Sequence, residues 1–206
     1  MAANLKKEAN LEVSGRGPVR LRVVSAEASM VTIEIGIDYS KASVPHLHYE
    51  ADYCDVVAAR AGVALSFGKL RPGADVLRTK VEISFSEEFF IRNVWKTTRE
   101  LHQTTRTMAR GRELAPLSGL ADPDKVQCFR ANNVFMAVLP SEAVLDFYYI
   151  SPGDIQLAQQ RKKPDIDLEP VVRVLVSTPL LLEFLDKCKP LAETIAPPIE
   201  SEEEHV

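Results

Sequence analysis

The chain has 206 residues, of which 46% are hydrophobic, and its 25 Lys and Arg against 29 Asp and Glu give a net charge of −4. Four acids (Glu200, Glu202, Glu203 and Glu204) lie in the last seven residues, so the other 25 acids balance the 25 bases. The chain before these acids is therefore neutral overall. Its hydrophobic content excludes bulk disorder, and its lack of net positive charge excludes a protein whose whole surface binds nucleic acid.

Membrane and secretion signals are missing from the pattern. No apolar run approaches the ~18 residues of a membrane span, and the first 17 residues lack the apolar centre of a signal peptide. The three cysteines (Cys54, Cys128 and Cys188) are widely spaced and form no CxxC pair. We therefore expect a cytoplasmic protein without a disulfide framework, a structural zinc site or a cofactor.

The first half of the chain predicts strands followed by one helix. Residues 1–17 are polar and predict a flexible N-terminus. Residues 18–38 contain two alternating runs, with Val19, Leu21 and Val23 in the first, and predict a β-hairpin with its turn at residues 25–29. Further strands are expected at residues 47–59, 63–70 and 76–85, with a turn at residues 71–75. Ser86, followed by two glutamates, predicts a helix that extends to about residue 108.

The second half repeats this order of elements. Residues 109–125 combine Pro, Gly and charge and predict a linker. Strands are expected at residues 126–139 and 143–150, with a turn at residues 140–142, then a polar loop at residues 156–170 and a strand at residues 171–176. Thr178 as N-cap and Pro179 as first helical residue predict a helix to Ile195. Residues 196–206 are expected to form a disordered acidic tail.

An internal repeat is the strongest pattern in the sequence. With residue 50 placed over residue 130, residues 50–73 align with residues 130–153 without a gap. Identical pairs fall at core-phase and turn positions: Ala51/Ala131, Leu65/Leu145, Phe67/Phe147, Pro72/Pro152 and Gly73/Gly153. The alignment predicts a duplicated β-β-β-α unit, with copies at residues 18–108 (which include the N-terminal hairpin) and 126–195. The competing interpretation is two unrelated α+β stretches of similar strand composition.

One such unit is too small to bury a secure core, so we expect the two to pack as an intrachain pseudo-dimer. The expected class is α+β, with antiparallel sheets and an N-terminal β-hairpin. The pattern leaves open whether the units share one sheet or pack their sheets face to face. The two halves also differ in net charge, which is +3 for residues 1–115 and −3 for residues 116–195.

Residues 126–195 resemble a family of small, functionally uncharacterised bacterial and archaeal domains. The likeness is carried by residues 132–134, Ser141-Glu142, residues 144–147 (VLDF), Pro152-Gly153, the strand around Arg173 and residues 177–179. The resemblance implies a strand-strand-strand-helix fold and a bacterial origin, and it implies no activity. The first unit departs from the pattern, since Ser66 replaces the Asp of LDF and only Arg78 is a candidate match for Arg173. The order of elements is also similar to SecB-type export chaperones, as an analogy of topology.

Few residues indicate chemistry. His46, His48, Glu50, Asp52 and Cys54 share one parity, and His-x-His is a weak candidate for metal binding; a solvated edge strand is the more frequent arrangement. Cys54 and Cys128 have no nucleophile signature around them, and a buried strand cysteine is the default. Asp146 and the acids at 165, 167 and 169 are interpreted as solvated charges.

Three groups of residues are candidates for binding, and the loop at residues 155–168 is one of them. Phe147, Tyr148 and Tyr149 are consecutive in a predicted strand, so alternation turns at least one of them outward. Arg92, Lys96 and Arg99 give the first helix a basic excess that would fit an acidic protein or a nucleic acid.

The sequence therefore predicts a non-enzymatic, cytoplasmic bacterial protein that binds a partner or itself through sheet edges and faces. The alternatives are a SecB-like holdase chaperone and a nucleic-acid binder that uses the basic helix.

Overall fold

The computed structural model describes residues 11–12, 17–27, 30–60, 62–70, 77–109, 126–160 and 165–196. The expected flexible ends, the turn at residues 71–75 and nearly all of the predicted linker lie outside these residues. Within them the chain is mixed α+β with mostly antiparallel sheets, so the predicted fold class is confirmed. The chain divides into two compact units, residues 1–44 with 149–170 (unit 1) and residues 45–148 with 171–206 (unit 2).

Unit 1 contains the N-terminal hairpin. Strands β2 (Val19–Glu27) and β3 (Met30–Ile37) pair antiparallel, and the short β1 (Leu11–Glu12) adds to β2. The alternation behaves as predicted, since Val19 and Leu21 are buried and Arg20 is exposed. A short 3₁₀ turn, η1 (Tyr39–Lys41), follows β3 and is capped by the side chain of Asp38. The hairpin is therefore grouped with residues 149–170, and not with the first predicted β-β-β-α unit.

The polar loop predicted at residues 156–170 is partly wrong, because helix α3 (Pro152–Gln159) occupies its beginning. Pro152 stands at the first helical position and Asp154 lies in the positively polarised first turn, which favours a helix at this point. After it, Ile166 and Leu168 are buried while Asp165 and Asp167 are exposed, so the second part of the segment alternates like a strand.

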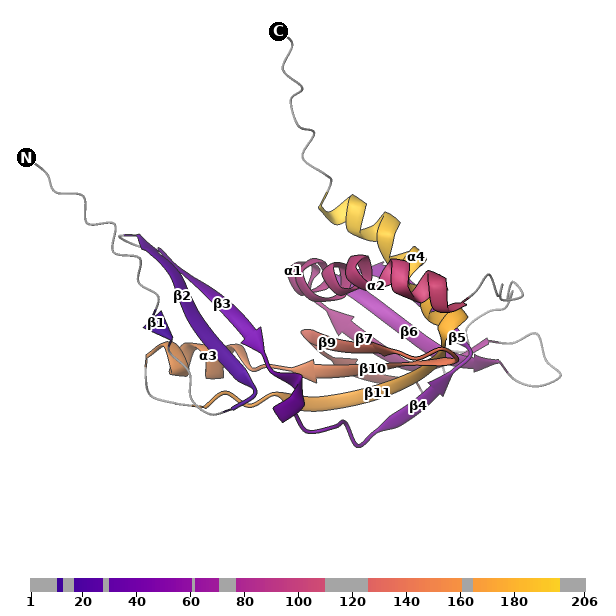
Figure 1. Ribbon diagram of the computed structural model, residues 1–206, viewed down its shortest axis with the longest axis horizontal. Helices are drawn as coiled ribbons and strands as arrows, with labels where there is room; N and C mark the ends of the chain where they lie inside the picture. The colour runs from indigo at the N-terminus through magenta and orange to yellow at the C-terminus, as the bar shows by residue number, and fades with distance from the viewer. Residues whose placement is uncertain are drawn as a thin grey trace, which may run out of the picture. The chain divides into compact units, whose positions relative to one another are not determined.

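Unit 2 contains two four-stranded sheets (Figure 1). One has the order β4-β11-β10-β9 and comprises β4 (His48–Ala51), β9 (Asn133–Val138), β10 (Glu142–Tyr149) and β11 (Glu169–Ser177). The other has the order β5-β6-β7-β8 and comprises β5 (Tyr53–Ala59), β6 (Gly62–Leu70), β7 (Leu77–Phe85) and β8 (Gln127–Arg130). In each sheet three strands form a meander, β9-β10-β11 in one and β5-β6-β7 in the other. A short strand from elsewhere in the chain, β4 or β8, is added beside the third strand of the meander.

The two short strands, β4 and β8, show that two of the predicted strands are wrong. The single strand expected at residues 47–59 is broken at Asp52, and the one expected at residues 126–139 is broken between β8 and β9. As a result β4 leaves its own meander and pairs in parallel with β11, while β8 pairs in parallel with β7. Each meander therefore receives the first strand of the other, an exchange that a pattern of apolar residues along the chain does not specify.

The two meanders have the same register. Cys54 pairs with Phe67 in the first hairpin, and Val134 pairs with Phe147 in the second, which are the positions joined by the ungapped alignment. The backbone N–H of Asp52 donates to Gly68 O (2.9 Å), and that of Asn132 donates to Tyr148 O (3.0 Å). The shared register is the structural observation on which a proposed duplication rests.

The helices follow the third strand of each meander. After β7 come α1 (Glu87–Phe89), a π-helical turn η2 (Phe90–Trp95) and α2 (Lys96–Ala109); after β11 comes α4 (Thr178–Ile195). Ser86 and Ser177 are the two N-caps, and each accepts a hydrogen bond from the third residue beyond it. Ser177 therefore replaces Thr178 as the predicted cap. The Thr178 hydroxyl is buried and donates to Leu139 O (2.8 Å).

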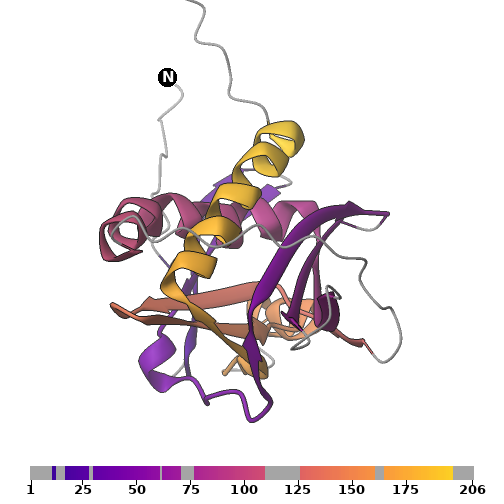
Figure 2. The ribbon, with the colours of Figure 1, turned by 90° about the vertical axis from the view of Figure 1, so that its right-hand side faces the viewer.

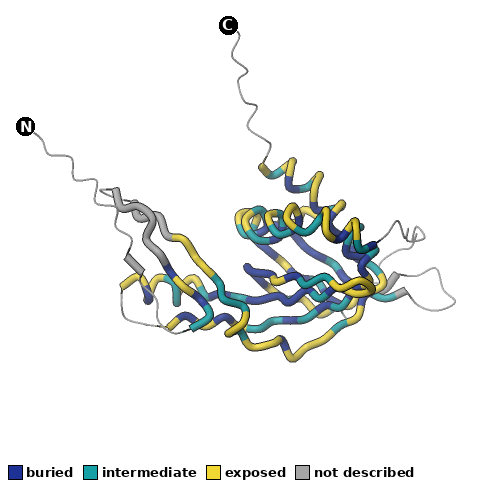
Figure 3. Tube along the Cα trace, in the orientation of Figure 1, coloured by how far each residue is buried: buried dark blue, intermediate teal, exposed yellow. Residues whose placement is uncertain are grey.

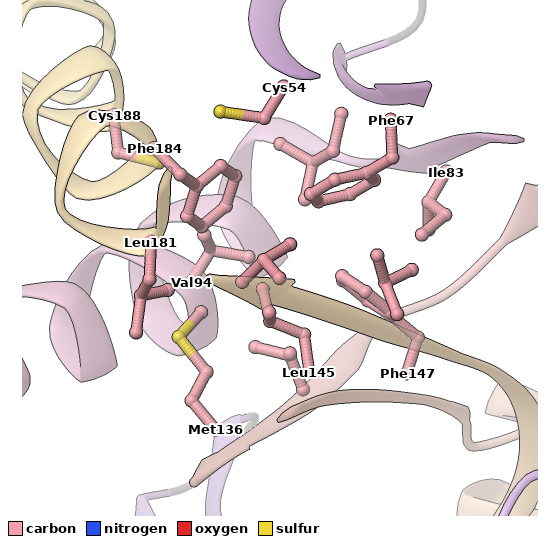
Figure 4. Close-up of a cluster of buried hydrophobic side chains, with 14 of the residues drawn as sticks. Cys54, Phe67, Ile83, Val94, Met136, Leu145, Phe147, Leu181, Phe184 and Cys188 are labelled. Carbon is pink, nitrogen blue, oxygen red and sulfur yellow. The ribbon is translucent and has the colours of Figure 1, made fainter. Parts of the chain in front are cut away.

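One core cluster joins the sheets and helices of unit 2. Phe147 of β10 lies 6.0 Å from Phe67 of β6 and 6.1 Å from Phe85 of β7, measured between ring centroids. Phe184 of α4 stands 5.7 Å from Phe67 (Figure 4). In Figure 2 the yellow helix α4 crosses α2, and in Figure 3 the buried segments run along the strands of unit 2. The inner faces of both sheets are thus covered by each other and by the helices.

Gly62, at the start of β6, has a backbone conformation that L residues rarely adopt. Its φ is +137°, and a Cβ placed on it would lie 1.9 Å from Phe85 O. We expect Gly62→Ala to destabilise unit 2 by at least ~2–3 kcal/mol, because backbone strain adds to a clash with a neighbouring strand. Urea unfolding followed by Trp95 fluorescence measures the loss, and an unchanged midpoint would contradict it. Gly36→Ala is the control, since a Cβ there meets nothing within 4 Å.

Candidate functional site

The ends of the two sheets differ in how they are covered. Sheet edges carry unpaired backbone groups, and proteins usually protect them with charge, proline or a covering element. On β5 the cover is α4: Lys187 Nζ donates to Cys54 O (2.6 Å), and the Cys54 thiol lies 3.8 Å from Leu180 O. The short end strands β4 and β8 are linked to each other by a hydrogen bond from the Tyr49 hydroxyl to Gln127 Oε1. Within the described residues, β5 is thus covered by α4, and β4 and β8 are linked to each other.

Strand β9 is the fourth edge, and its composition lacks the usual protection. Its sequence, NVFMAV, contains neither charge nor proline. On the face turned away from the core, Phe135 is 38% exposed, and Leu139, just beyond the strand, is 48% exposed. The Asn93 side chain of η2 donates to Asn132 O (2.6 Å), immediately before the strand begins. We call residues 133–139 the β9 edge.

The hydrogen-bond phase shows which backbone groups of the β9 edge point away from its sheet. Leu139 N donates to Glu142 O (2.8 Å) on the β10 side. Bonded and non-bonded pairs alternate in an antiparallel ladder, so Ala137 also bonds to its partner Val144. The N–H and C=O of Met136 and Val138 therefore point outward, in the plane where an added strand would lie. Chemically, this edge can accept a further β-strand.

An ion pair lies one strand inward. Arg173 of β11 binds Asp146 of β10 through two hydrogen bonds, Nε to Oδ1 (2.6 Å) and Nη2 to Oδ2 (2.7 Å). The Asp146 side chain is 4% exposed and that of Arg173 is 24% exposed. The prediction of a solvated Asp146 is therefore wrong. Because Asp146 also pairs in register with Phe135 of β9, the ion pair braces the strands behind the β9 edge.

The pKa values around this pair follow its contacts. The hydrogen bond to Asp146 raises the pKa of Arg173, and partial burial opposes that rise. Burial raises the pKa of Tyr148 on the same strand, and the nearby Asp146 carboxylate adds to the effect. The guanidinium and the phenol thus stay protonated at neutral pH, which suits a bracing role better than proton transfer.

The predicted aromatic surface is largely internal. Phe147 is fully buried in the core and Tyr148 is 3% exposed, while Tyr149 is half-buried. Alternation does turn Phe147 and Tyr148 to opposite faces, but both faces of β10 are covered at this point. Phe147 and Tyr148 are therefore corrected from surface to interior residues, and Phe135 of the neighbouring strand supplies the exposed aromatic ring.

The basic candidates are on the surface. Arg92 of η2, and Lys96 and Arg99 of α2, are all exposed, and Arg92 forms an ion pair with Glu88 (3.1 Å).

The histidine candidates do not share a face with Cys54. His46 and His48 are exposed, and His48 Nε2 lies 2.7 Å from Pro45 O. Glu50 forms an ion pair with Lys69 (2.8 Å), and the chain bends at Asp52, so that Cys54 points into the core from another sheet. Among the described residues, no three His, Cys, Asp or Glu side chains gather as a metal site would require.

The buried thiols are poor nucleophiles. Burial raises the pKa of Cys54 to about 12, and it also raises the pKa of Cys188 on α4. Thiolates, and not thiols, carry out nucleophilic chemistry. Beside Cys54, burial and then Asp55 raise the pKa of Tyr53 to about 12. Cys128, the third cysteine, is exposed on β8.

The β9 edge was missed by sequence reasoning, because its local pattern points to a different position in the sheet. The run NVFMAV has apolar residues at both parities and no charge, which favours a strand buried on both sides. Its position at the end of a sheet becomes visible only in the structure. The histidine, cysteine and aromatic candidates are not brought together with it.

The described residues form an α+β protein with two exchanged meanders, and β9 is the end strand of one sheet whose own sequence carries neither charge nor proline. No family model, curated protein or solved structure matches the chain. Over the described residues, no helix has both the length and the apolar character needed to cross a bilayer.

Proposed function

We propose that this protein is a non-enzymatic binding module that captures an extended polypeptide segment by adding it as a strand beside β9. The observation that carries the proposal is the β9 edge itself: an end strand without charge or proline, with Phe135 and Leu139 exposed along one face. Strand addition uses backbone hydrogen bonds for affinity and alternate side chains for specificity.

The contrast with β5 supports this proposal. Both strands are the outer members of hairpins with the same register, yet Lys187 of α4 reaches the carbonyl of Cys54 on β5. At β9 the nearby helical segment, η2, reaches the carbonyl of Asn132, which precedes the strand. Because η2 reaches only the residue before β9, the backbone groups of Met136 and Val138 that point out of the sheet are not covered by it.

The geometry also specifies the partner's chemistry. An added strand would bond to the backbone of Met136 and Val138, and its alternate residues would lie beside Phe135, Ala137 and Leu139. Those residues would be apolar, because each would cover exposed apolar surface worth ~25 cal/mol per Å². The expected ligand is therefore an extended segment with alternating apolar residues and no proline at its bonded positions.

Two variants test the edge. Leu139→Lys places a charge where proteins put edge-protecting lysines, and Val138→Pro removes an outward N–H. We expect each to weaken binding of a fluorescent, reduced and carboxymethylated α-lactalbumin, an unfolded polypeptide probe, by at least about tenfold. Anisotropy titration measures the affinity. Neither change removes a hydrogen bond between β9 and β10, so the urea midpoint should stay close to that of the parent.

Matched controls separate the edge from general effects. Val57→Lys puts the same charge on β5 at a 43% exposed residue, and probe binding should persist. Ala137→Pro removes an N–H that bonds to β10, so it should lower stability where Val138→Pro does not. Equal loss of binding in Val57→Lys and Leu139→Lys, or unaltered binding in Val138→Pro, would overturn the proposal.

The alternative functions predict different outcomes in the same assay. A SecB-like holdase would bind many unfolded clients and suppress their aggregation, and Leu139→Lys would affect all of them equally. A nucleic-acid binder would retain an oligonucleotide in a salt-sensitive manner through Arg92, Lys96 and Arg99, and the β9 variants would leave that retention unchanged.

We propose that the two meanders arose by duplication, on the strength of their shared register. The cytoplasmic location, the bacterial origin and the likeness of residues 126–195 to the uncharacterised domain family are also proposals. Self-association through two β9 edges is included, since a second copy can supply the extended strand.

A further inference from the structure

A stripe of basic side chains follows one face of η2 and α2. It consists of Arg92, Lys96, Arg99 and Arg106, whose spacing places them on one side of a helix, and all four are exposed. Arg92 has an ion-pair partner in Glu88, but Lys96, Arg99 and Arg106 have none within the described structure. Glu100 stands one turn after Lys96 and is not paired with it there. We call these four residues the basic stripe.

Helix α4 packs against α2, and its direction fixes on which side of α2 the helix ends. His102 of α2 contacts Asp186 of α4 (2.8 Å), and one turn earlier on α2 the Thr98 hydroxyl interacts with the Cys188 thiol. Going forward along α4 therefore means going backward along α2, toward Lys96 and Arg92. The two helices cross in this sense in Figure 2. The C-terminal end of α4 consequently lies on the side where the stripe begins.

The chain beyond α4 carries concentrated negative charge. α4 ends at Ile195, and residues 200–204 contain Glu200, Glu202, Glu203 and Glu204 without any basic residue. At ~3.3–3.6 Å per extended residue, five residues reach about 17 Å and nine reach about 30 Å. The stripe from Lys96 to Arg106 spans about 15 Å of helix. Residues 200–204, the acidic segment, are thus tethered to α4 by a connection whose extended length is comparable with the length of the stripe.

We propose that the acidic segment of the same chain docks on the basic stripe. The four carboxylates would meet a stripe of four cations, of which Lys96, Arg99 and Arg106 have no ion-pair partner within the described residues, and the short connection gives the segment an effective concentration that an independent acidic partner would have to exceed. In the isolated protein the acidic segment then occupies the stripe, so a polyanion must displace this segment in order to bind there. The proposal is independent of strand capture at the β9 edge, which lies on other residues.

A zero-length carbodiimide cross-link provides the direct test, because Lys96 is the stripe's one amine. We expect peptide mapping of the full chain to recover Lys96 joined to Glu200, Glu202, Glu203 or Glu204. Mixing heavy-isotope and normal chains separates contacts within one molecule from contacts between molecules. The yield should fall at least roughly fivefold from 50 to 500 mM NaCl, as the screening length shrinks from about 14 to about 4 Å.

Variants that keep Lys96 complete the test. Arg99→Glu with Arg106→Glu should reduce the Lys96 cross-link several-fold, because the segment loses most of its attraction. Arg60→Glu with Arg130→Glu makes the same charge change at exposed residues elsewhere and should leave the yield unaltered. The proposal is overturned if both double variants behave alike, if the cross-links join mixed isotopes, or if the segment never joins Lys96.

Polyanion binding gives an independent readout. Changing the four glutamates of the acidic segment to glutamine should shift elution from a heparin column to higher salt. The control changes four exposed acids elsewhere (Glu34, Asp52, Glu142 and Glu169) and has the same net charge. Equal shifts in both variants would mean that total charge alone decides retention, which contradicts docking on the stripe.

Discussion

Phe147→Ala is expected to lower the free energy of unfolding of unit 2 by about 3–5 kcal/mol, the cost typical of truncating a fully buried phenylalanine. Phe147 is 0% exposed and contacts the rings of both Phe67 and Phe85. Removing its ring leaves a void where two sheets meet, and neither sheet can move inward without disturbing its helices. Urea unfolding followed by the fluorescence of Trp95, the single tryptophan, measures the loss.

Phe135→Ala is the matched control on the neighbouring strand. Phe135 is 38% exposed, so its truncation should cost no more than roughly 1 kcal/mol. The probe affinity should change in the opposite order, with a larger loss in Phe135→Ala than in a Phe147→Leu variant that keeps the core filled. A Phe147→Ala cost below that of Phe135→Ala would contradict the assignment of Phe147 to the core.

Arg173→Met is expected to cost about 3–5 kcal/mol, because it leaves the Asp146 carboxylate buried without its partner. Asp146→Leu should cost less, about 1–3 kcal/mol, since the Arg173 side chain is 24% exposed and its charged end can reach water. The double variant should recover to within about 1 kcal/mol of the parent, because an apolar pair replaces an ion pair of similar volume. Urea unfolding of the four proteins completes the cycle.

The cycle also separates a structural role from a binding role. If the ion pair only braces β10 against β11, the double variant should bind the unfolded polypeptide probe as the parent does. Additive costs, with no recovery in the double variant, would contradict the bracing role. Normal stability together with lost probe binding would instead make Asp146 and Arg173 part of the binding site.

Local patterns predicted those elements that depend on neighbours in sequence. The N-terminal hairpin follows from alternation around Leu21. The first helix begins at its predicted cap, Ser86, and the last one begins at Ser177, one residue before the predicted cap. The ungapped alignment also joined positions that prove to have equal register, such as Cys54 and Val134. Helix α3 was missed because a short polar helix has no apolar stripe, although Pro152 and Asp154 mark its start.

The candidate site was not predicted, because each of its features depends on contacts between distant residues. Asp146 has the parity of an outward residue, and only the approach of Arg173 from another strand turns it into a buried partner. Phe147 and Tyr148 alternate as expected, but burial on both faces of β10 depends on what packs there. β9 is an edge because, among the strands that the structure describes, it stands last in its sheet order.

The sequence by itself determined the α+β class, the alternation of the N-terminal hairpin, and the starts of the main helices to within one residue. These follow from alternation, capping and turn chemistry, which act over a few residues. Only the tertiary structure decided that β4 and β8 exchange between the meanders, that Asp146 is buried, and that β9 is the last of the described strands in its sheet. Those outcomes depend on which surfaces meet after the chain has folded, and strands with the same local pattern can occupy the middle or the end of a sheet.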